Sequence, residues 1–230
     1  MKMTKKLICC DVFKEELNLI SLPPGLNTEF ISMGLHLHPK KLHQKVQEAL
    51  DNVSGCSLVI LGFGLCGGSL NGIKAPDCRI VMPRVHDCIP VLLGSVEKFN
   101  SLRQQDHRTF YFSGGWVEGE RMMIPEYERT CLEWGPQKAL RVFRMMFEHY
   151  NRLMYIHTGH PRDAAALRRT RDFGGILGLP CLETPGDLKQ LELLINGPWD
   201  SEDFVIIPPH GIINQDEFLI PGGEIQVQGL

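Results

Sequence analysis

The chain of 230 residues contains no apolar run that approaches the roughly twenty residues needed for a membrane-spanning helix. The apolar stretch near its first residue is too short for a signal peptide, and Asp11 ends it. We therefore expect a cytoplasmic protein without a membrane partner. A basic surplus is also lacking, because the formal net charge is −3 at pH 7, and this disfavours nucleic-acid binding.

Several chemical signatures are missing as well. The chain has no C-x-x-C pair, which excludes a zinc ribbon and a standard ferredoxin cluster site. It has neither a G-x-S-x-G elbow nor a Walker loop, which disfavours serine-hydrolase and P-loop chemistry. Gly62, Gly64 and Gly67 do match G-x-G-x-x-G, but the residues that follow predict a loop where dinucleotide binding requires a helix.

The composition that is present is that of an ordinary globular protein. Hydrophobic residues make up 43% of the chain and charged residues 22%, so a packed core is expected. The length suits one large domain or two small, closely packed ones. In a cytoplasmic chain, the eight cysteines are expected to be thiols or metal ligands rather than disulfides.

Short apolar runs alternate with amphipathic stretches along the chain. Strands are predicted at residues 6–13, 29–35, 57–63, 79–83, 109–113, 154–158 and 204–208. Helices are predicted at residues 39–52, 87–102, 136–152, 161–177 and 187–195. Continuously apolar runs are typical of strands buried on both faces. We therefore predict one doubly wound α/β domain over residues 1–230, with a mostly parallel sheet covered by helices on both faces. A two-lobed arrangement with a break near residues 117–129 is the alternative.

Cysteine and histidine residues lie at or just after the C-terminal ends of the predicted strands. Cys10 ends the first strand, His36 follows the second, and Cys66 follows the third. His86 and Cys88 follow the fourth strand. In open α/β sheets, ligands bind beyond the carboxyl ends of the strands, so these side chains are expected to gather in one site.

A metal site is the first hypothesis for these residues. Cys10, Cys66 and Cys88 would supply thiolate ligands, and His36 or His86 would complete the shell. Three cysteines with one open position suit catalytic zinc, or an iron–sulfur cluster with one free iron. Such a metal could polarise a sulfur- or methyl-bearing substrate.

A metal-free cysteine enzyme is the second hypothesis. Cys88 lies in the first turn of a predicted helix, where the helix dipole and free amides stabilise a thiolate. Cys88 or Cys66 would be the nucleophile and His86 the base. Amides of the glycine loop would hold an anion.

Further residues are candidates for binding a cofactor or a small-molecule substrate. Gly64, Gly67 and Gly68 let the backbone approach a ligand closely. Arg84 would bind a carboxylate or phosphate, or form a structural salt bridge. Trp116, after paired glycines, would form an aromatic wall of the site or pack in the core.

For most of the remaining histidines and cysteines, no role in the site is predicted. The histidines expected to be ordinary polar residues with hydrogen-bond partners are His43, His107 and His149. Weaker ligand candidates are His157, His160 and His210. Cysteines without a partner at ligand spacing, assigned to packing or surface, are Cys56, Cys78, Cys131 and Cys181.

The combination of these motifs resembles domain-of-unknown-function family 1638. The segments that carry the resemblance are residues 10–11, 34–36, 62–68, 83–89, 92–95, 115–116 and 199–204. Together they span most of the chain. The chain departs from the family pattern at Gly114, where a proline usually precedes the Gly-Trp pair, and at Pro209-His210.

The resemblance carries functional implications. Members of this family are prokaryotic, and some are encoded beside corrinoid-dependent methyltransferases. This implies a role in methyl or one-carbon metabolism, as an enzyme or as a non-catalytic partner of a corrinoid protein or methyltransferase. The family pattern also implies that the site residues are Cys10, His36, Cys66, His86 and Cys88.

Overall fold

The strands of the computed structural model form two separate sheets. The structure describes residues 4–119, 122–200 and 202–218. A five-stranded sheet has the order β2-β1-β3-β4-β8, with β1 at Lys5–Cys10, β2 at Asn27–Ile31, β3 at Leu58–Gly62, β4 at Arg79–Pro83 and β8 at Phe204–Ile207. A three-stranded sheet has the order β5-β6-β7, with β5 at Thr109–Phe112, β6 at Arg152–His157 and β7 at Cys181–Pro185. We call the parts built on these sheets the first lobe and the second lobe.

Neighbouring strands are parallel throughout both sheets, except that β8 runs antiparallel to β4. The α/β class and the mostly parallel pairing are therefore confirmed. Every residue of β3 is buried, as continuous apolarity predicts for a central strand. Because β1, β3 and β4 run in the same direction, the segments that follow Cys10, Gly62 and Pro83 leave the sheet at the same edge.

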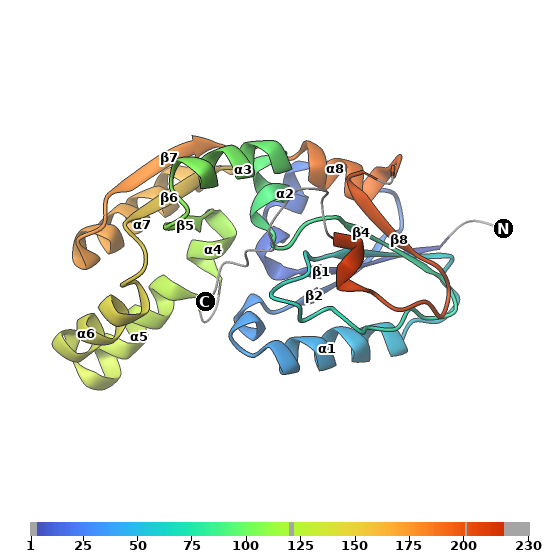
Figure 1. Ribbon diagram of the computed structural model, residues 1–230, viewed down its shortest axis with the longest axis horizontal. Coiled ribbons are helices and arrows are strands. Elements are labelled where there is room, and N and C mark those ends of the chain that lie inside the picture. The colour runs from blue at the N-terminus through green and yellow to red at the C-terminus, as the bar shows by residue number, and fades with distance from the viewer. Residues whose placement is uncertain (1–3, 120–121, 201, 219–230) are drawn as a thin grey trace.

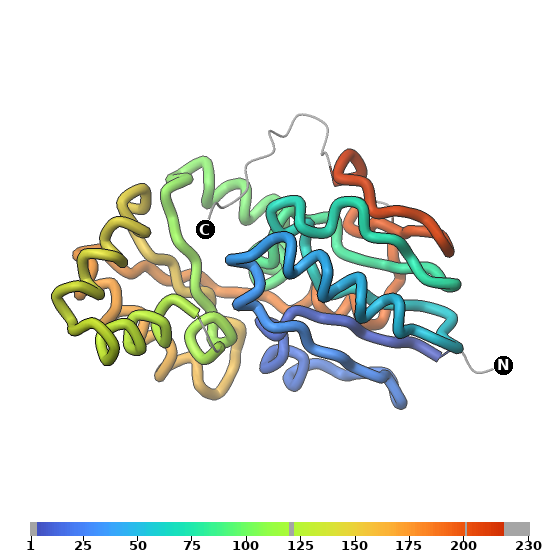
Figure 2. Tube along the Cα trace, turned by 90° about the horizontal axis from the view of Figure 1, so that it is seen from below, coloured from blue at the N-terminus to red at the C-terminus, as the bar shows by residue number. Residues whose placement is uncertain are grey.

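Helices cover both faces of the first sheet. Figure 1 shows α1 (Pro39–Asp51) on one side and α2 (Ile89–Leu93) with α8 (Lys189–Asn196) on the other. The view from below, Figure 2, places α1 in front of the strands. The other α-helices are α3 (Val96–Gln105), α4 (Gly114–Glu118), α5 (Met123–Trp134), α6 (Pro136–Met146) and α7 (Asp163–Leu177). In the described part of the chain, no helix combines the length and the apolar character that crossing a membrane requires.

Helix α1 shows how the pattern becomes packing. Its buried side chains are Leu42, Val46, Ala49 and Leu50, which recur at helical spacing and form one apolar stripe against the sheet. Pro39 occupies the first turn, where a missing backbone N–H costs nothing.

Four predicted elements differ from the observed ones. The strand predicted over residues 6–13 ends at Cys10, and residues 11–13 form a 3₁₀ helix. The strand predicted over residues 29–35 ends at Ile31, and residues Met33–Leu37 form the 3₁₀ helix η3. The helix predicted over residues 87–102 is two helices, because Gly94 takes a left-handed conformation and the Ser95 hydroxyl caps α3 by accepting from Lys98 N at 3.1 Å. The helix predicted over residues 136–152 ends at Met146, and residues from Arg152 onward already belong to β6.

The two lobes meet at the carboxyl ends of their strands. After β1, the 3₁₀ helix η1 (Asp11–Phe13) packs against α4 of the second lobe. A Cβ atom on Gly115 would lie 2.2 Å from the Val12 carbonyl oxygen, so only glycine permits this approach. Asp187 N, just after β7, donates to Leu92 O in α2 at 3.1 Å. The strand ends that carry the candidate residues therefore lie at the boundary between the lobes.

Candidate functional site

Three thiols come together at the lobe boundary. Cys10 ends β1 and is 1% exposed, and Cys88, just before α2, is 7% exposed. Cys66 lies half-buried in the loop after β3. Each of the three sulfur atoms interacts electrostatically with at least one of the other two. The structure thus brings together the three cysteines that the sequence analysis placed at separate strand ends.

The glycine loop is fastened to the segment after β4. Leu65 N donates to Val85 O at 2.9 Å, and Cys66 N donates to the carbonyl of His86 at 2.8 Å. A Cβ atom on Gly64 would lie 2.8 Å from the backbone nitrogen of Asp87, so this contact requires glycine. Cys66 itself has a positive φ of 48°, a conformation uncommon for residues other than glycine. The two loops therefore hold Cys66 in a strained backbone position.

His36 provides the imidazole nearest to these thiols. Its Nε2 lies 3.3 Å from Cys66 Sγ, and its Nδ1 lies 2.8 Å from Met33 O. A carbonyl oxygen only accepts hydrogen bonds, so Nδ1 carries the proton. Burial lowers the pKa of His36, which keeps the ring neutral. Nε2 is therefore unprotonated and accepts a hydrogen bond from the Cys66 thiol.

Asp11 positions the helix that carries His36. Its Oδ1 accepts a hydrogen bond from Met33 N at 2.7 Å, at the first residue of η3. The Ser32 hydroxyl caps the same helix by accepting from Gly34 N at 3.3 Å. Residues 36 and 38 consequently do not alternate along a strand: His36 points to Cys66, whereas His38 is exposed at the start of α1.

The site is buried and contains acidic neighbours. Burial raises the pKa of the Cys66 thiol to about 12, and raises the pKa values of Cys10 and Cys88 well above the ordinary range. The neighbouring charges that raise these pKa values further come from Asp11, Asp87 and the thiols themselves. Burial also raises the pKa of Asp87 to about 6, although its carboxylate accepts from Ile89 N at 2.8 Å.

Trp116 is the contribution of the second lobe to this site. It lies in α4, is 8% exposed, and packs edge-on against Phe110 with ring centroids 6.0 Å apart. Its indole Nε1 has no hydrogen-bond partner within normal distance and angle among the described residues. The indole N–H nevertheless lies close enough to Cys88 to lower the pKa of that thiol slightly, against the larger effect of burial. Trp116 is thus both a core residue and a wall of the site.

Two other candidates face different surroundings. The His86 imidazole lies near the main chain of Phe218 and the guanidinium of Arg103, and burial lowers its pKa. Arg84 donates to the backbone carbonyls of Glu217 and Phe204, which attaches the C-terminal segment to β4. His36, rather than His86, is therefore the imidazole in contact with a thiol.

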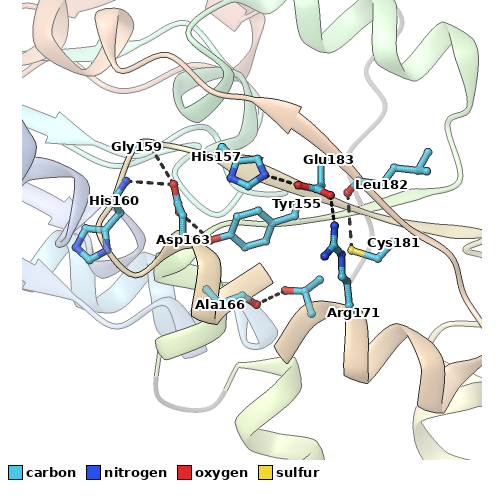
Figure 3. Close-up of polar contacts among 11 residues, drawn as sticks. Tyr155, His157, Gly159, His160, Asp163, Ala166, Arg171, Cys181, Leu182 and Glu183 are labelled. Carbon is cyan, nitrogen blue, oxygen red and sulfur yellow. Dashed lines mark hydrogen bonds and ion pairs between the residues drawn. The ribbon is translucent and has the colours of Figure 1, made fainter. Parts of the chain in front are cut away.

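His157, at the end of β6, and His160, in the loop after it, take part in polar contacts away from the three thiols (Figure 3). Tyr155 donates to Asp163 Oδ1 at 2.8 Å, and Asp163 Oδ2 accepts from Gly159 N at 2.9 Å and from His160 N at 3.1 Å. His157 contacts Glu183 at 2.8 Å. The bonds to Asp163 fix the loop between β6 and α7, and the contact between His157 and Glu183 joins β6 to β7.

The candidate ligands are not arranged around a metal position in this structure. Within residues 4–119, 122–200 and 202–218, no group of three or more His, Cys, Asp or Glu side chains is arranged so that it could hold a metal. Among the candidate ligands in the described residues, His36 Nε2 and Cys66 Sγ are in direct contact, 3.3 Å apart. Binding of a metal would therefore require the candidate ligands to rearrange.

Sequence analysis missed Glu16, a fully buried carboxyl group at the lobe boundary. Glu16 lies in the 3₁₀ helix η2 (Glu16–Leu19) and is 0% exposed. Its Oε1 accepts from the Thr158 hydroxyl of the second lobe at 3.2 Å, while Oε2 has no partner among the described residues. Burial raises the pKa of Glu16 to about 7. Its position beside Glu15 gives no sign of burial in the sequence, because paired acids usually face solvent.

Replacing Glu16 by glutamine is expected to stabilise the protein at alkaline pH. A carboxyl whose folded pKa is raised binds its proton more tightly in the folded state, so wild-type stability falls as pH rises from about 4.5 through about 7. Glu16→Gln keeps the acceptor for Thr158 and removes this dependence. Urea unfolding should show a gain on the order of 2 kcal/mol at about pH 8 and none at about pH 4. An equal effect at both pH values would contradict the raised pKa.

The comparisons with known proteins identify the family. The model of the family described as "Protein of unknown function (DUF1638)" matches residues 30–195. The chain belongs to this family. No curated protein and no solved structure matches it. The resemblance noted in the sequence is therefore confirmed, and the family segment includes His36, Cys66, Cys88 and Trp116, while Cys10 precedes it.

Proposed function

We propose that the protein binds a thiophilic metal, as a zinc ion or an iron–sulfur cluster, through Cys10, Cys66 and Cys88 with His36 as a further ligand. The observation that carries the proposal is the orientation of His36. Its Nδ1–H donates to the Met33 carbonyl and its Nε2 lone pair faces Cys66 Sγ. Metal-binding histidines are oriented in this way by a carbonyl or carboxylate partner on the other ring nitrogen.

The charge balance of the site supports the same proposal. Three thiols and Asp87 lie together in a buried place; Arg103 interacts with Asp87, whereas no lysine or arginine is among the groups that shift the pKa values of the thiols. Deprotonating several buried thiols without a nearby cation is costly, whereas a bound metal would hold them as thiolates and neutralise their charge. Three sulfur ligands and one imidazole are a donor set that zinc prefers.

The chemistry that such a centre offers fits a role in methyl, one-carbon or sulfur metabolism. When bound, a zinc ion or an iron with an open position would polarise a sulfur- or methyl-bearing group of a substrate. The protein would act on a small-molecule substrate as an enzyme, or serve as an accessory factor that docks to a corrinoid protein or methyltransferase. Exposed apolar side chains on α5 and α6 support a docking role; they are Leu132, Trp134 and Met145.

Cobalt titration tests the metal proposal directly. Metal-free protein titrated with Co²⁺ should develop the intense visible absorption of tetrahedral, thiolate-bound cobalt, with an end point near one ion per chain. Zinc should then displace the cobalt. Weak absorption of the kind given by oxygen-bound, octahedral cobalt would count against ligation by Cys10, Cys66 and Cys88.

A metal-free cysteine nucleophile is the second candidate, because His36 contacts Cys66. Burial opposes it, since a thiol with a pKa of about 12 is almost entirely protonated at neutral pH. We expect Cys66 in metal-free protein to react with iodoacetamide at pH 7 about a hundredfold more slowly than free cysteine. Peptide mass spectrometry after timed labelling measures this rate. Rapid labelling at Cys66 or Cys88 alone would favour the nucleophile instead.

A further inference from the structure

The second lobe contributes one buried hydrogen-bond donor to the thiol site. Helix α4 follows β5 and packs against η1, the 3₁₀ helix that begins directly after Cys10. The close approach of Gly115 to the Val12 carbonyl fixes the spacing of these two elements. Trp116 is the next residue of α4. Main-chain contact between the lobes therefore sets its position relative to the end of β1.

The indole of Trp116 is confined by packing on the side of the second lobe. It lies edge-on to Phe110, which also packs against Phe147 and Tyr150 with ring centroids 4.9 and 5.1 Å apart. Its Nε1 is shielded from solvent and has no hydrogen-bond partner among the described residues. A buried N–H without an acceptor is costly, because it has given up its hydrogen bond to water. A change that creates an acceptor beside it is therefore favoured.

The sulfur atom of Cys88 is the group placed to become that acceptor. The indole N–H interacts with this sulfur, outside the distance and angle of a full hydrogen bond. A protonated thiol is a weak acceptor, whereas hydrogen bonds to a charged acceptor are shorter and about twice as strong. A metal ligand is a thiolate. Ligation of a metal by Cys88 would therefore supply the acceptor that the indole lacks.

We propose that Trp116 is a positioning residue of the metal centre, and that its indole N–H donates a hydrogen bond to the Cys88 thiolate when a metal is bound. The inference rests on the proposed function of Cys88 as a ligand. Partners that hydrogen-bond to metal ligands orient them and raise the affinity for the metal. The donor comes from the second lobe and the thiolate from the first, so the contact between the lobes and metal binding would favour each other.

Trp116→Phe tests the proposal, because phenylalanine keeps an aromatic ring beside Phe110 and removes the N–H. The Kd for Zn²⁺, measured by competition with a chelator of known affinity, should rise about tenfold. The thiolate-to-cobalt absorption of the Co²⁺ protein should move to longer wavelength, because the sulfur lone pairs lose the stabilising N–H. Trp134→Phe is the matched control, since Trp134 is 59% exposed in α5, and it should change neither quantity.

A second variant separates the hydrogen bond from packing, because phenylalanine is smaller than tryptophan. Benzothienylalanine in place of Trp116 keeps two fused rings and replaces the N–H by a sulfur atom. It should reproduce both effects of Trp116→Phe. Zinc affinity and a cobalt spectrum equal to those of the wild type would overturn the role of Trp116 alone. A wild-type chain that takes up neither zinc nor cobalt would contradict the metal proposal and this inference with it.

Discussion

Replacing Cys66 by serine is expected to reduce the bound metal from about one zinc, or several irons, per chain to a small fraction of that amount. Serine keeps the size of the side chain but replaces a soft thiolate by a hydroxyl that stays protonated at neutral pH. The substitution also removes the sulfur in contact with His36 Nε2. Metal content after purification under nitrogen, measured by mass spectrometry, checks this expectation.

Cys131→Ser is the matched control for this experiment. Cys131 is also half-buried, but it lies in α5 and takes no part in the interactions of the three thiols. It should retain the full wild-type metal content. Circular dichroism of both variants establishes that they are folded. Full retention of metal in folded Cys66→Ser would remove Cys66 from the set of ligands.

Gly115→Ala is expected to destabilise the protein strongly. The new Cβ would lie 2.2 Å from the Val12 carbonyl oxygen and 3.1 Å from its carbon, both of them backbone atoms. Backbone cannot rotate aside, so α4 must move away from η1, and Trp116 must move with it. We expect a loss of about 3 kcal/mol in the free energy of unfolding, measured by urea denaturation.

Gly175→Ala is the control for Gly115→Ala. Gly175 is exposed in the last turn of α7, and a Cβ atom there would meet no atom within 4 Å. Alanine favours the helix over glycine, so this variant should gain up to about 0.5 kcal/mol. Similar unfolding free energies for both variants would show that the contact between Gly115 and Val12 does not hold the lobes together.

The sequence predicted the α/β class because central strands carry a strong signal. Runs such as Leu58–Leu61 are apolar at every position, and only a sheet covered on both faces buries them. The edge strand β7 gave no such signal, since most of Cys181–Pro185 is not buried. Division of the strands between two sheets depends on long-range pairing, which local patterns do not encode.

The gathering of the thiols could also be predicted, because parallel strands end at a common edge. The partner of Cys66 could not be chosen in the same way. His86 is nearer in sequence to Cys88, but its ring points toward Phe218, while the turn of η3 directs His36 to the sulfur. That turn depends on the bond from Met33 N to Asp11, two residues 22 positions apart in the chain.

The central claim is that Cys10, Cys66 and Cys88 hold a metal, and elemental analysis tests it most directly. The full chain should be purified without oxygen and without an affinity tag, and then measured by mass spectrometry for zinc and iron. We predict about one zinc, or several irons, per folded chain. A folded protein that contains neither metal and takes up neither on reconstitution would contradict the account.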